Sequence, residues 1–373
     1  MNQQNQSPPK GYRVVPEDIP NKGILFVDHG KENRSGHGGN CLTECRNGDI
    51  LAFYSNVSGE IDNGHGVAGW TEYRRSTDYG RTWGAPVVLE YSKRTWEGDE
   101  MYSALVFGVT TAADGTLVAF VSRFDEGLWV KKYPPVVLLS HDHGETWSEP
   151  RPLDPQATVE DASLTFDAVF VHHDKVFAVF MGGAANYCPG PYSLYVSGDN
   201  GESFQLRSRL PFDNENYYVT AGVLDGGKII VYSYPYRKNA EINEHDIPYV
   251  LSSDEGRSWS EVRTTRFARK IRNPQFSPKI GDYYFLHGRS GHFGEEAKHL
   301  ILYASSDGIH WDDGILLHRK EIGGGDAYSA NEVIGKFDPR KPRRLLIQSS
   351  IAYEDGTSKV NEHHWWIEDI GGT

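Results

Sequence analysis

A motif of eight residues occurs five times in this chain and constrains its fold more than any other feature. It reads Ser-x-Asp-x-Gly-x-Thr/Ser-Trp/Phe, and its aspartates are Asp78, Asp142, Asp199, Asp254 and, in a shortened copy, Asp307. The steps between successive aspartates are 64, 57, 55 and 53 residues. A near-constant step of this size is typical of one supersecondary unit that is used repeatedly.

The residue types in the motif predict a tight turn with a structural role. A short aspartate side chain accepts backbone N–H hydrogen bonds across its own turn, and glycine adopts the positive φ that closes the turn. The tryptophan or phenylalanine that follows is a large apolar anchor. We expect this aromatic residue to pack on the neighbouring sheet.

Short β-rich runs fill the intervals between the motifs, and no stretch has a helical period over a dozen residues. In the first unit these runs lie at residues 41–45, 50–54 and 70–75. Six such units of about four strands predict an all-β fold, a six-bladed β-propeller.

The two ends of the chain have separate predicted roles. We expect the strand at 24–28 to complete the last blade, which closes the ring and removes its free edges. The polar start predicts a disordered tail over residues 1–15, followed by a single propeller domain over residues 16–373.

The composition excludes several classes of protein. The 51 acidic and 38 basic residues give a formal net charge of −13, which argues against nucleic acid as the main partner. No apolar run approaches the roughly eighteen residues that a membrane span needs, so we expect no membrane insertion. The first 16 residues lack the apolar segment of a signal peptide. We therefore expect a cytoplasmic protein, or a secreted or periplasmic one whose leader has been removed.

Three cysteines, Cys41, Cys45 and Cys188, are an odd set that is too small for a disulfide framework. They are also too few to hold zinc without other ligands. We expect them to be small buried apolar residues, and we expect neither a metal ion nor a cofactor.

Candidate functional residues follow from the topology of a propeller. The innermost strand of each blade starts at one face, and its hairpin partner ends there, so polar residues at these positions line one central pocket. Acids, arginines and a tyrosine in such a pocket are what a polar, sugar-like ligand needs. The chain offers for this pocket His37, Asp62, His65, Glu215, Arg237, Arg272, Arg289 and Tyr328.

The repeated motif resembles the Asp box of the sialidase superfamily, and the resemblance covers about residues 22–370. Blade one is most similar to the family, through the segments at 47–54 and 74–78. In sialidases, the acid in the loop that Asp62 matches is the general acid/base. The segment Ala327-Tyr328-Ser329 resembles the strand that carries the tyrosine nucleophile of the family. The resemblance implies these roles for Asp62 and Tyr328, with Glu215 as the base for the tyrosine.

The chain departs from the sialidase pattern at the arginines that hold the substrate carboxylate. Sialidases open blade one with Arg-Ile-Pro, where this chain has His37-Gly38-Gly39-Asn40. The place of the second arginine resembles Tyr234, and the third has no clear match. This carboxylate clamp is therefore absent or displaced, which argues against an ordinary sialoside as substrate.

The nearest substitutes provide the predicted substrate-binding set. The Asn-Glu pair that starts blade four in sialidases falls near Tyr217-Tyr218 here, and several histidines and arginines lie close to the pocket in sequence. The residues predicted to bind substrate are His37, His65, Arg237, Arg272, Arg289 and Tyr217.

Three functions are consistent with these residues. The first is a sialidase-like glycoside hydrolase that acts on a polysaccharide or oligosaccharide other than an ordinary sialoside. The second is a polysaccharide lyase for uronic-acid sugars, in which His37 takes the proton next to the uronate carboxylate. The third is a non-catalytic propeller that binds a carbohydrate or a protein, because a displaced clamp is also what a lost active site would show.

Overall fold

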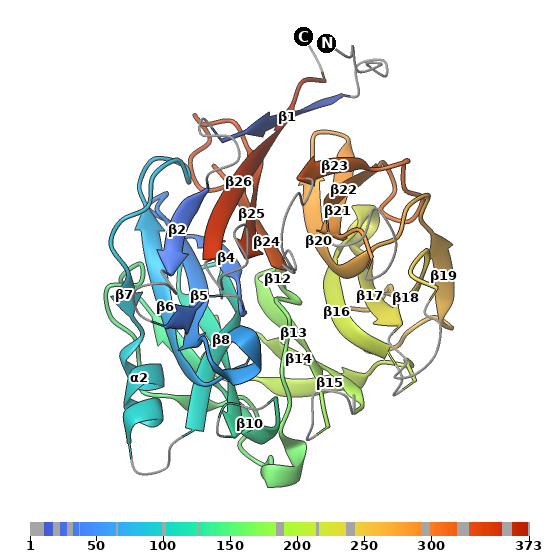
Figure 1. The fold of residues 1–373 in the computed structure, drawn as a ribbon. Coiled ribbons are helices and arrows are strands. Elements are labelled where there is room, and N and C mark those ends of the chain that lie inside the picture. The colour runs from blue at the N-terminus through green and yellow to red at the C-terminus, as the bar shows by residue number, and fades with distance from the viewer. Residues whose placement is uncertain are drawn as a thin grey trace.

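Short strands build six antiparallel sheets that stand around a central axis in the computed structural model (Figure 1). The structure describes residues 11–17, 23–27, 33–36, 38–64, 66–98, 102–125, 127, 129–183, 190–213, 216–235, 243–291, 299–318, 328–352 and 360–371. Within these ranges it does not describe the side chains of Asp62, Asn63, Asn216, Tyr217, Ile351, Ala352, Val360 and Asn361. The six-bladed β-propeller predicted from the repeats is confirmed.

Each blade runs outwards from the axis in the order of its strands. Blade one contains β4 (Cys41–Glu44), β5 (Ile50–Ser58), β6 (Gly69–Ser76) and β7 (Val87–Val88), and β3 (Arg34–Ser35) also pairs with β5. Blade two contains β8 (Tyr102–Thr111), β9 (Leu117–Asp125), β10 (Lys131–Ser140) and β11 (Arg151–Pro152). Blade three contains β12 (Val169–His172), β13 (Lys175–Met181), β14 (Tyr192–Ser197) and β15 (Gln205–Arg209).

The second half of the ring repeats this order. Blade four contains β16 (Asn216–Val223), β17 (Ile229–Pro235), β18 (Asp246–Ser252) and β19 (Arg263–Arg266). Blade five contains β20 (Arg272–Ile280), β21 (Tyr283–Arg289), β22 (Leu300–Ser305) and β23 (Ile315–His318). Blade six contains β24 (Tyr328–Ile334), β25 (Arg344–Ala352) and β26 (Val360–Asp369).

Strands from the start of the chain complete blade six. Both β1 (Tyr12–Pro16) and β2 (Ile24–Val27) pair with β26, as the prediction for the early strand required (Figure 1). The predicted tail is too long, however, because residues 12–15 belong to this sheet. Tyr12 holds β1 in place: it is buried, and its ring lies 4.9 Å from the ring of Phe285 in blade five.

Helices are few and short in the described ranges. The only α-helix there is α2 (Glu90–Glu97), whose eight residues are too few to produce a helical period over a dozen residues. Three 3₁₀ turns, η1 (Ile61–Gly64), η2 (Val159–Asp161) and η3 (Asp225–Gly227), lie in connections between strands. The strands therefore provide nearly all of the regular structure that positions the site.

The five motifs form the predicted turns, each after the third strand of a blade. In the second copy, Gly144 N donates to Ser140 Oγ (2.8 Å) and Thr146 N donates to Asp142 Oδ1 (2.9 Å). The other full copies repeat both hydrogen bonds. The third strand is parallel to the innermost strand, so these turns lie at the face opposite the starts of the innermost strands. Their role is structural.

The aromatic residue of each motif packs on the preceding blade, as predicted. Trp147 of blade two lies 5.8 Å from Phe53 of blade one, measured between ring centroids. The other four aromatic residues make equivalent contacts, which pair Trp83 with His364, Phe204 with Phe120, Trp259 with Ser208, and Trp311 with Tyr232. The motif therefore joins successive blades.

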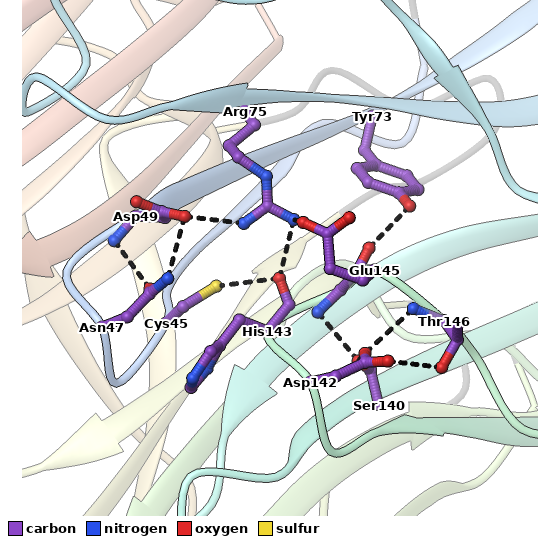
Figure 2. Close-up of polar contacts among 11 residues, drawn as sticks. Cys45, Asn47, Asp49, Tyr73, Arg75, Ser140, Asp142, His143, Glu145 and Thr146 are labelled. Atoms are coloured by element: carbon purple, nitrogen blue, oxygen red, sulfur yellow. Dashed lines mark hydrogen bonds and ion pairs between the residues drawn. The ribbon is translucent and has the colours of Figure 1, made fainter.

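Polar contacts reinforce the junction between blades one and two (Figure 2). Arg75 of β6 reaches the carboxylate of Asp49 (2.8 Å), the carbonyl oxygen of His143 (2.9 Å) and the carboxylate of Glu145 (2.7 Å). Tyr73 donates a hydrogen bond to the carbonyl of Gly144 (2.8 Å). Arg75 of blade one thus binds the turn of blade two at two points, His143 and Glu145, and is also bound by Asp49 of its own blade.

The glycine of the motif is needed for close approach as well as for the turn. Gly144 has a φ of 84°, and a Cβ there would lie 2.5 Å from Leu51 of blade one. At Gly256 a Cβ would lie 2.1 Å from Leu194 of blade three. Real Cβ contacts are longer than this, so the blades pack at this distance only because the residue is glycine.

Cysteine burial agrees with the prediction where it can be compared. Cys41 and Cys45 are free and fully buried in the apolar core between blades one and two. Cys188 lies outside the described residues.

Candidate active site at the propeller mouth

A narrow cavity lies where the innermost strands begin, and all six blades contribute to it. Its volume is about 30 Å³. We call it the mouth cavity, and its lining residues are Gly39, Asn40, Phe107, Phe166, Tyr218, Asn273, Gln275, Tyr328 and Ser329. This convergence of distant segments on one axis is what the propeller topology predicts for a ligand site.

Tyr328 lies at the first position of β24 and is only partly buried. The guanidinium carbon of Arg289 lies 4.7 Å from the centroid of its ring, which is within range of a cation–π interaction. Arg289 is itself 1% exposed. The structure therefore places one predicted substrate-binding residue directly against the predicted nucleophile.

Arg272 and Arg289 are register partners across the β20–β21 hairpin of blade five. The Arg272 guanidinium carbon lies 5.9 Å from the ring centroid of Tyr234, on β17. Burial raises the pKa of the Tyr234 hydroxyl, which donates a 2.8 Å hydrogen bond to the buried carboxylate of Glu244. Two cations, a phenol and a carboxylate thus lie together behind the mouth cavity.

Tyr218 forms the wall of the mouth cavity in blade four. Burial and the adjacent Tyr328 hydroxyl raise the pKa of the Tyr218 hydroxyl, while Arg272 and Arg289 oppose that rise. The Tyr218 ring lies 4.2 Å from the ring of Phe166, between centroids. Tyr218 therefore connects the cationic side of the mouth with an aromatic side.

Irregularities in three innermost strands aim side chains at the axis. The register of β8, β16 and β20 shifts around Phe107, Tyr218 and Asn273. Tyr218 and Asn273 also have positive φ angles, of 30° and 50°. Bulges and strained backbone often occur next to active sites, because they redirect side chains. Here each of the three bulged residues lines the mouth cavity.

His287 forms a hydrogen bond with Ser329, one of the residues that line the mouth cavity. Its Nδ1 lies 2.8 Å from Ser329 Oγ, and its Nε2 lies 2.9 Å from the amide nitrogen of Asn331. The amide can only donate, so Nε2 accepts and Nδ1–H donates to Ser329. Burial lowers the pKa of His287 to about 3. The neutral imidazole thus fixes Ser329.

A second polar cluster holds Asn40 on the other side of the axis. Asn40 Nδ2 donates to Glu362 Oε1 over 3.3 Å. Beside Glu362, the Nδ1 atoms of His363 and His364 lie 3.0 and 3.4 Å from the carboxylate of Glu17. Burial alone would raise the pKa of Glu17, but its hydrogen bonds to the two histidines lower it to about 2.

The loop that carries Asp62 lies at the same face as Tyr328. Strands β4 and β24 run side by side in the same direction. At their starts, Asn40 and Tyr328 line one cavity, and at their ends, Glu44 forms hydrogen bonds with Glu332 and Gly335. Strand β5 runs back towards the mouth, and η1, with Asp62, follows it directly. The Asp62 side chain is not among the described ones.

Several other predicted residues cannot be placed. Tyr217 lies on β16, where its backbone pairs with Tyr234, and its side chain is not described. Four more lie outside the described residues, namely His37, His65, Glu215 and Arg237. Their roles stay predictions.

Sequence reasoning missed Asn40, Phe107, Phe166, Tyr218 and Asn273 as site residues. Two of them had a readable signal. Gly108 inside a strand and Pro274 inside another both indicate a bulge, and the residue before each of them lines the cavity. No such signal marks Tyr218.

A larger cavity, of about 490 Å³, opens at the opposite end of the axis. Its lining includes Asp167, Glu332, Lys336, Lys279 and Arg343, and Gln275 lines both cavities. Both acidic and basic side chains therefore line it.

A comparison with known protein families shows to which family this chain belongs. Residues 23–266, about two thirds of the chain, match the BNR repeat-like domain. The chain belongs to this family. No curated protein matches the sequence.

Solved structures agree with a sialidase-like propeller. A protein of unknown function from Dyadobacter fermentans matches with a TM-score of 0.69 and 13% identity, covering 96% of this chain and 99% of that one. A K499G mutant of NanB sialidase from Streptococcus pneumoniae matches with a TM-score of 0.65 and 12% identity, covering 95% and 72%. The α-L-arabinanase of Penicillium chrysogenum, complexed with arabinobiose, matches with a TM-score of 0.56 and 16% identity, covering 96% and 98%.

This BNR repeat-like chain thus shares its fold with structures named as a sialidase and an arabinanase, and identities this low concern the fold alone. No helix in the described part of the chain is long and apolar enough to cross a membrane.

Proposed function

We propose that this BNR-repeat propeller is a sialidase-like glycoside hydrolase that acts on an oligosaccharide or polysaccharide other than an ordinary sialoside. The observation that carries the proposal is the position of Tyr328, which opens into the mouth cavity with the Arg289 guanidinium on its ring. Support also comes from the sialidase and arabinanase that share the fold.

The proposed reaction is a double displacement. Tyr328 Oη attacks the anomeric carbon while its proton passes to Glu215, and the bond to the leaving oxygen breaks as Asp62 protonates that oxygen. Water then attacks the anomeric carbon and gives its proton to Asp62. The bond between that carbon and Tyr328 Oη breaks, so the sugar leaves and Tyr328 becomes a phenolate. The phenolate recovers its proton from Glu215.

The buried arginines suit this chemistry electrostatically. A phenol has an ordinary pKa near 10, so attack at neutral pH needs a base or nearby positive charge. Arg289 is buried against the Tyr328 ring, in a region where charge is weakly screened. We propose that it stabilises negative charge as it develops on the phenol, which makes it a partner of the nucleophile.

Product release from a panel of glycans tests the proposed function. The purified chain is incubated with neutral and acidic oligosaccharides and polysaccharides, and new reducing ends are measured by chromatography. We expect hydrolysis of at least one glycan and little release from simple sialosides. An unsaturated product that absorbs in the ultraviolet would instead identify a lyase, and tight binding with no product from any glycan would identify a binding propeller.

A further inference from the structure

Two asparagines of the mouth cavity have amide groups that the fold leaves unsatisfied. Asn40 is 8% exposed and uses Nδ2 on Glu362, while its buried Oδ1 accepts no hydrogen bond from any described residue. Asn273 is 6% exposed, and neither Nδ2 nor Oδ1 has a partner among the described residues. Buried polar groups are nearly always hydrogen-bonded, so such groups beside a cavity point to a ligand.

The chemistry of these atoms restricts the ligand. Asn40 and Asn273 each offer an acceptor oxygen, and Asn273 also offers a donor nitrogen. A hydroxyl group can satisfy both kinds of atom because it donates and accepts. A carboxylate only accepts hydrogen bonds, so it would leave both amide oxygens unpaired. Its negative charge would also face the negative ends of the two amide C=O dipoles.

The opposite wall of the cavity is apolar. Phe107, Phe166 and Tyr218 form it, with Phe107 and Phe166 6.1 Å apart between ring centroids. A sugar has a face of C–H groups that packs on aromatic rings and an edge of hydroxyls that binds amides. The mouth cavity presents both surfaces across one axis.

The size of the cavity limits what enters it. A volume of about 30 Å³ holds roughly two or three water-sized groups, since one water needs about 10–15 Å³. A hydroxyl or hydroxymethyl substituent therefore fits, whereas a whole sugar ring stays above it, at the level of Tyr328.

We infer that Asn40 and Asn273 are specificity-determining residues that bind a hydroxyl-bearing substituent of a neutral sugar at the base of the mouth. The substrate class is then a neutral glycan, with uronates and sialosides disfavoured at this position. The inference rests on the proposed function only in taking the mouth as the place where the sugar binds.

Calorimetric binding tests this inference without depending on turnover. The probes are neutral trisaccharides of arabinose, xylose, mannose and galactose, with 3′-sialyllactose and digalacturonate as acidic counterparts. The full chain is compared with Asn273→Gly, which keeps the left-handed backbone available while removing the amide. Asn40→Ala is the second variant. The matched control is Asn200→Gly, which removes an amide with a φ of 59° from a motif turn at the opposite face.

We expect the chain to bind at least one neutral trisaccharide and neither acidic sugar. Asn273→Gly and Asn40→Ala should each weaken binding about 10-fold, the effect of one lost hydrogen bond, while Asn200→Gly binds normally. Melting temperatures identify any loss that comes from unfolding. Binding without hydrolysis, lost in the asparagine variants, would support the inference while removing the hydrolase proposal. Unchanged binding by a folded Asn273→Gly, preference for an acidic sugar, or no binding of any neutral sugar would overturn it.

Discussion

Replacing Tyr328 with phenylalanine is expected to reduce kcat/KM on the hydrolysed glycan by about 10³-fold or more, because the proposed nucleophile is removed. The substitution keeps the ring that Arg289 contacts, so the packing of the mouth is preserved. The free energy of unfolding should therefore change little. Initial rates at several glycan concentrations, together with urea unfolding, measure both effects.

A matched control separates loss of the nucleophile from loss of any hydroxyl. Tyr195→Phe removes the hydroxyl of a half-buried tyrosine on β14 in blade three, away from the mouth. This variant should retain wild-type kinetics. If Tyr328→Phe also turned over glycans at the wild-type rate, Tyr328 could not be the nucleophile.

Glu362→Gln is expected to increase stability at alkaline pH. Glu362 is 0% exposed, and burial raises its pKa from 4.5 to about 8, with Asn40 lowering it and the Glu17 carboxylate raising it further. Because the pKa of Glu362 is higher in the folded chain than in the unfolded chain, the protonated side chain favours folding. This contribution is complete below pH 4.5 and is lost as the pH rises through about 8. Glutamine mimics the neutral form and stays neutral.

The expected difference between Glu362→Gln and the wild-type chain is small at pH 5 and grows to the order of 3–5 kcal/mol at pH 9. Two histidines, one buried and one partly buried, act in the other direction. The pKa of His287 is lowered to about 3 and that of His318 to about 4, so their contributions are lost as the pH falls below 6.5. Subtracting the two unfolding curves at each pH cancels this shared effect.

Urea unfolding from pH 5 to pH 9 measures the difference. Glu90→Gln, at an exposed glutamate of α2, serves as the control and should shift the unfolding free energy little at any pH. A difference between Glu362→Gln and wild type that does not vary with pH would contradict the buried, neutral state of Glu362.

Repetition explains why the fold could be predicted from the sequence. Each copy of the turn motif marks the same place in a blade, so Asp78 to Asp307 set the count and spacing of the blades. The anchoring role of Trp147 was also readable, because a large aromatic residue after a tight turn needs a neighbouring surface. The strand at residues 12–15 was missed because a short segment at the start of the chain has no periodic signal. Its position depends on the packing of Tyr12 against Phe285 of blade five.

The site was less predictable because it depends on single irregular residues. Tyr328 and Arg289 could be proposed from their place at strand ends, and they do lie together. Tyr218 and Asn273 reach the axis through bulges, which shift a strand by one residue and so change which side chains face the cavity. Pro274 marks the shift at Asn273 in the sequence, whereas no local residue marks the shift at Tyr218, which depends on packing between blades.

A crystal structure of the protein soaked with a hydrolysed or tightly bound oligosaccharide most directly tests whether the propeller mouth is the carbohydrate site. The expected result is a sugar ring beside Tyr328, with one hydroxyl within hydrogen-bond distance of Asn273 in the mouth cavity. Sugar density found only in the larger cavity around Asp167, or only on the outer surface of the blades, would contradict it.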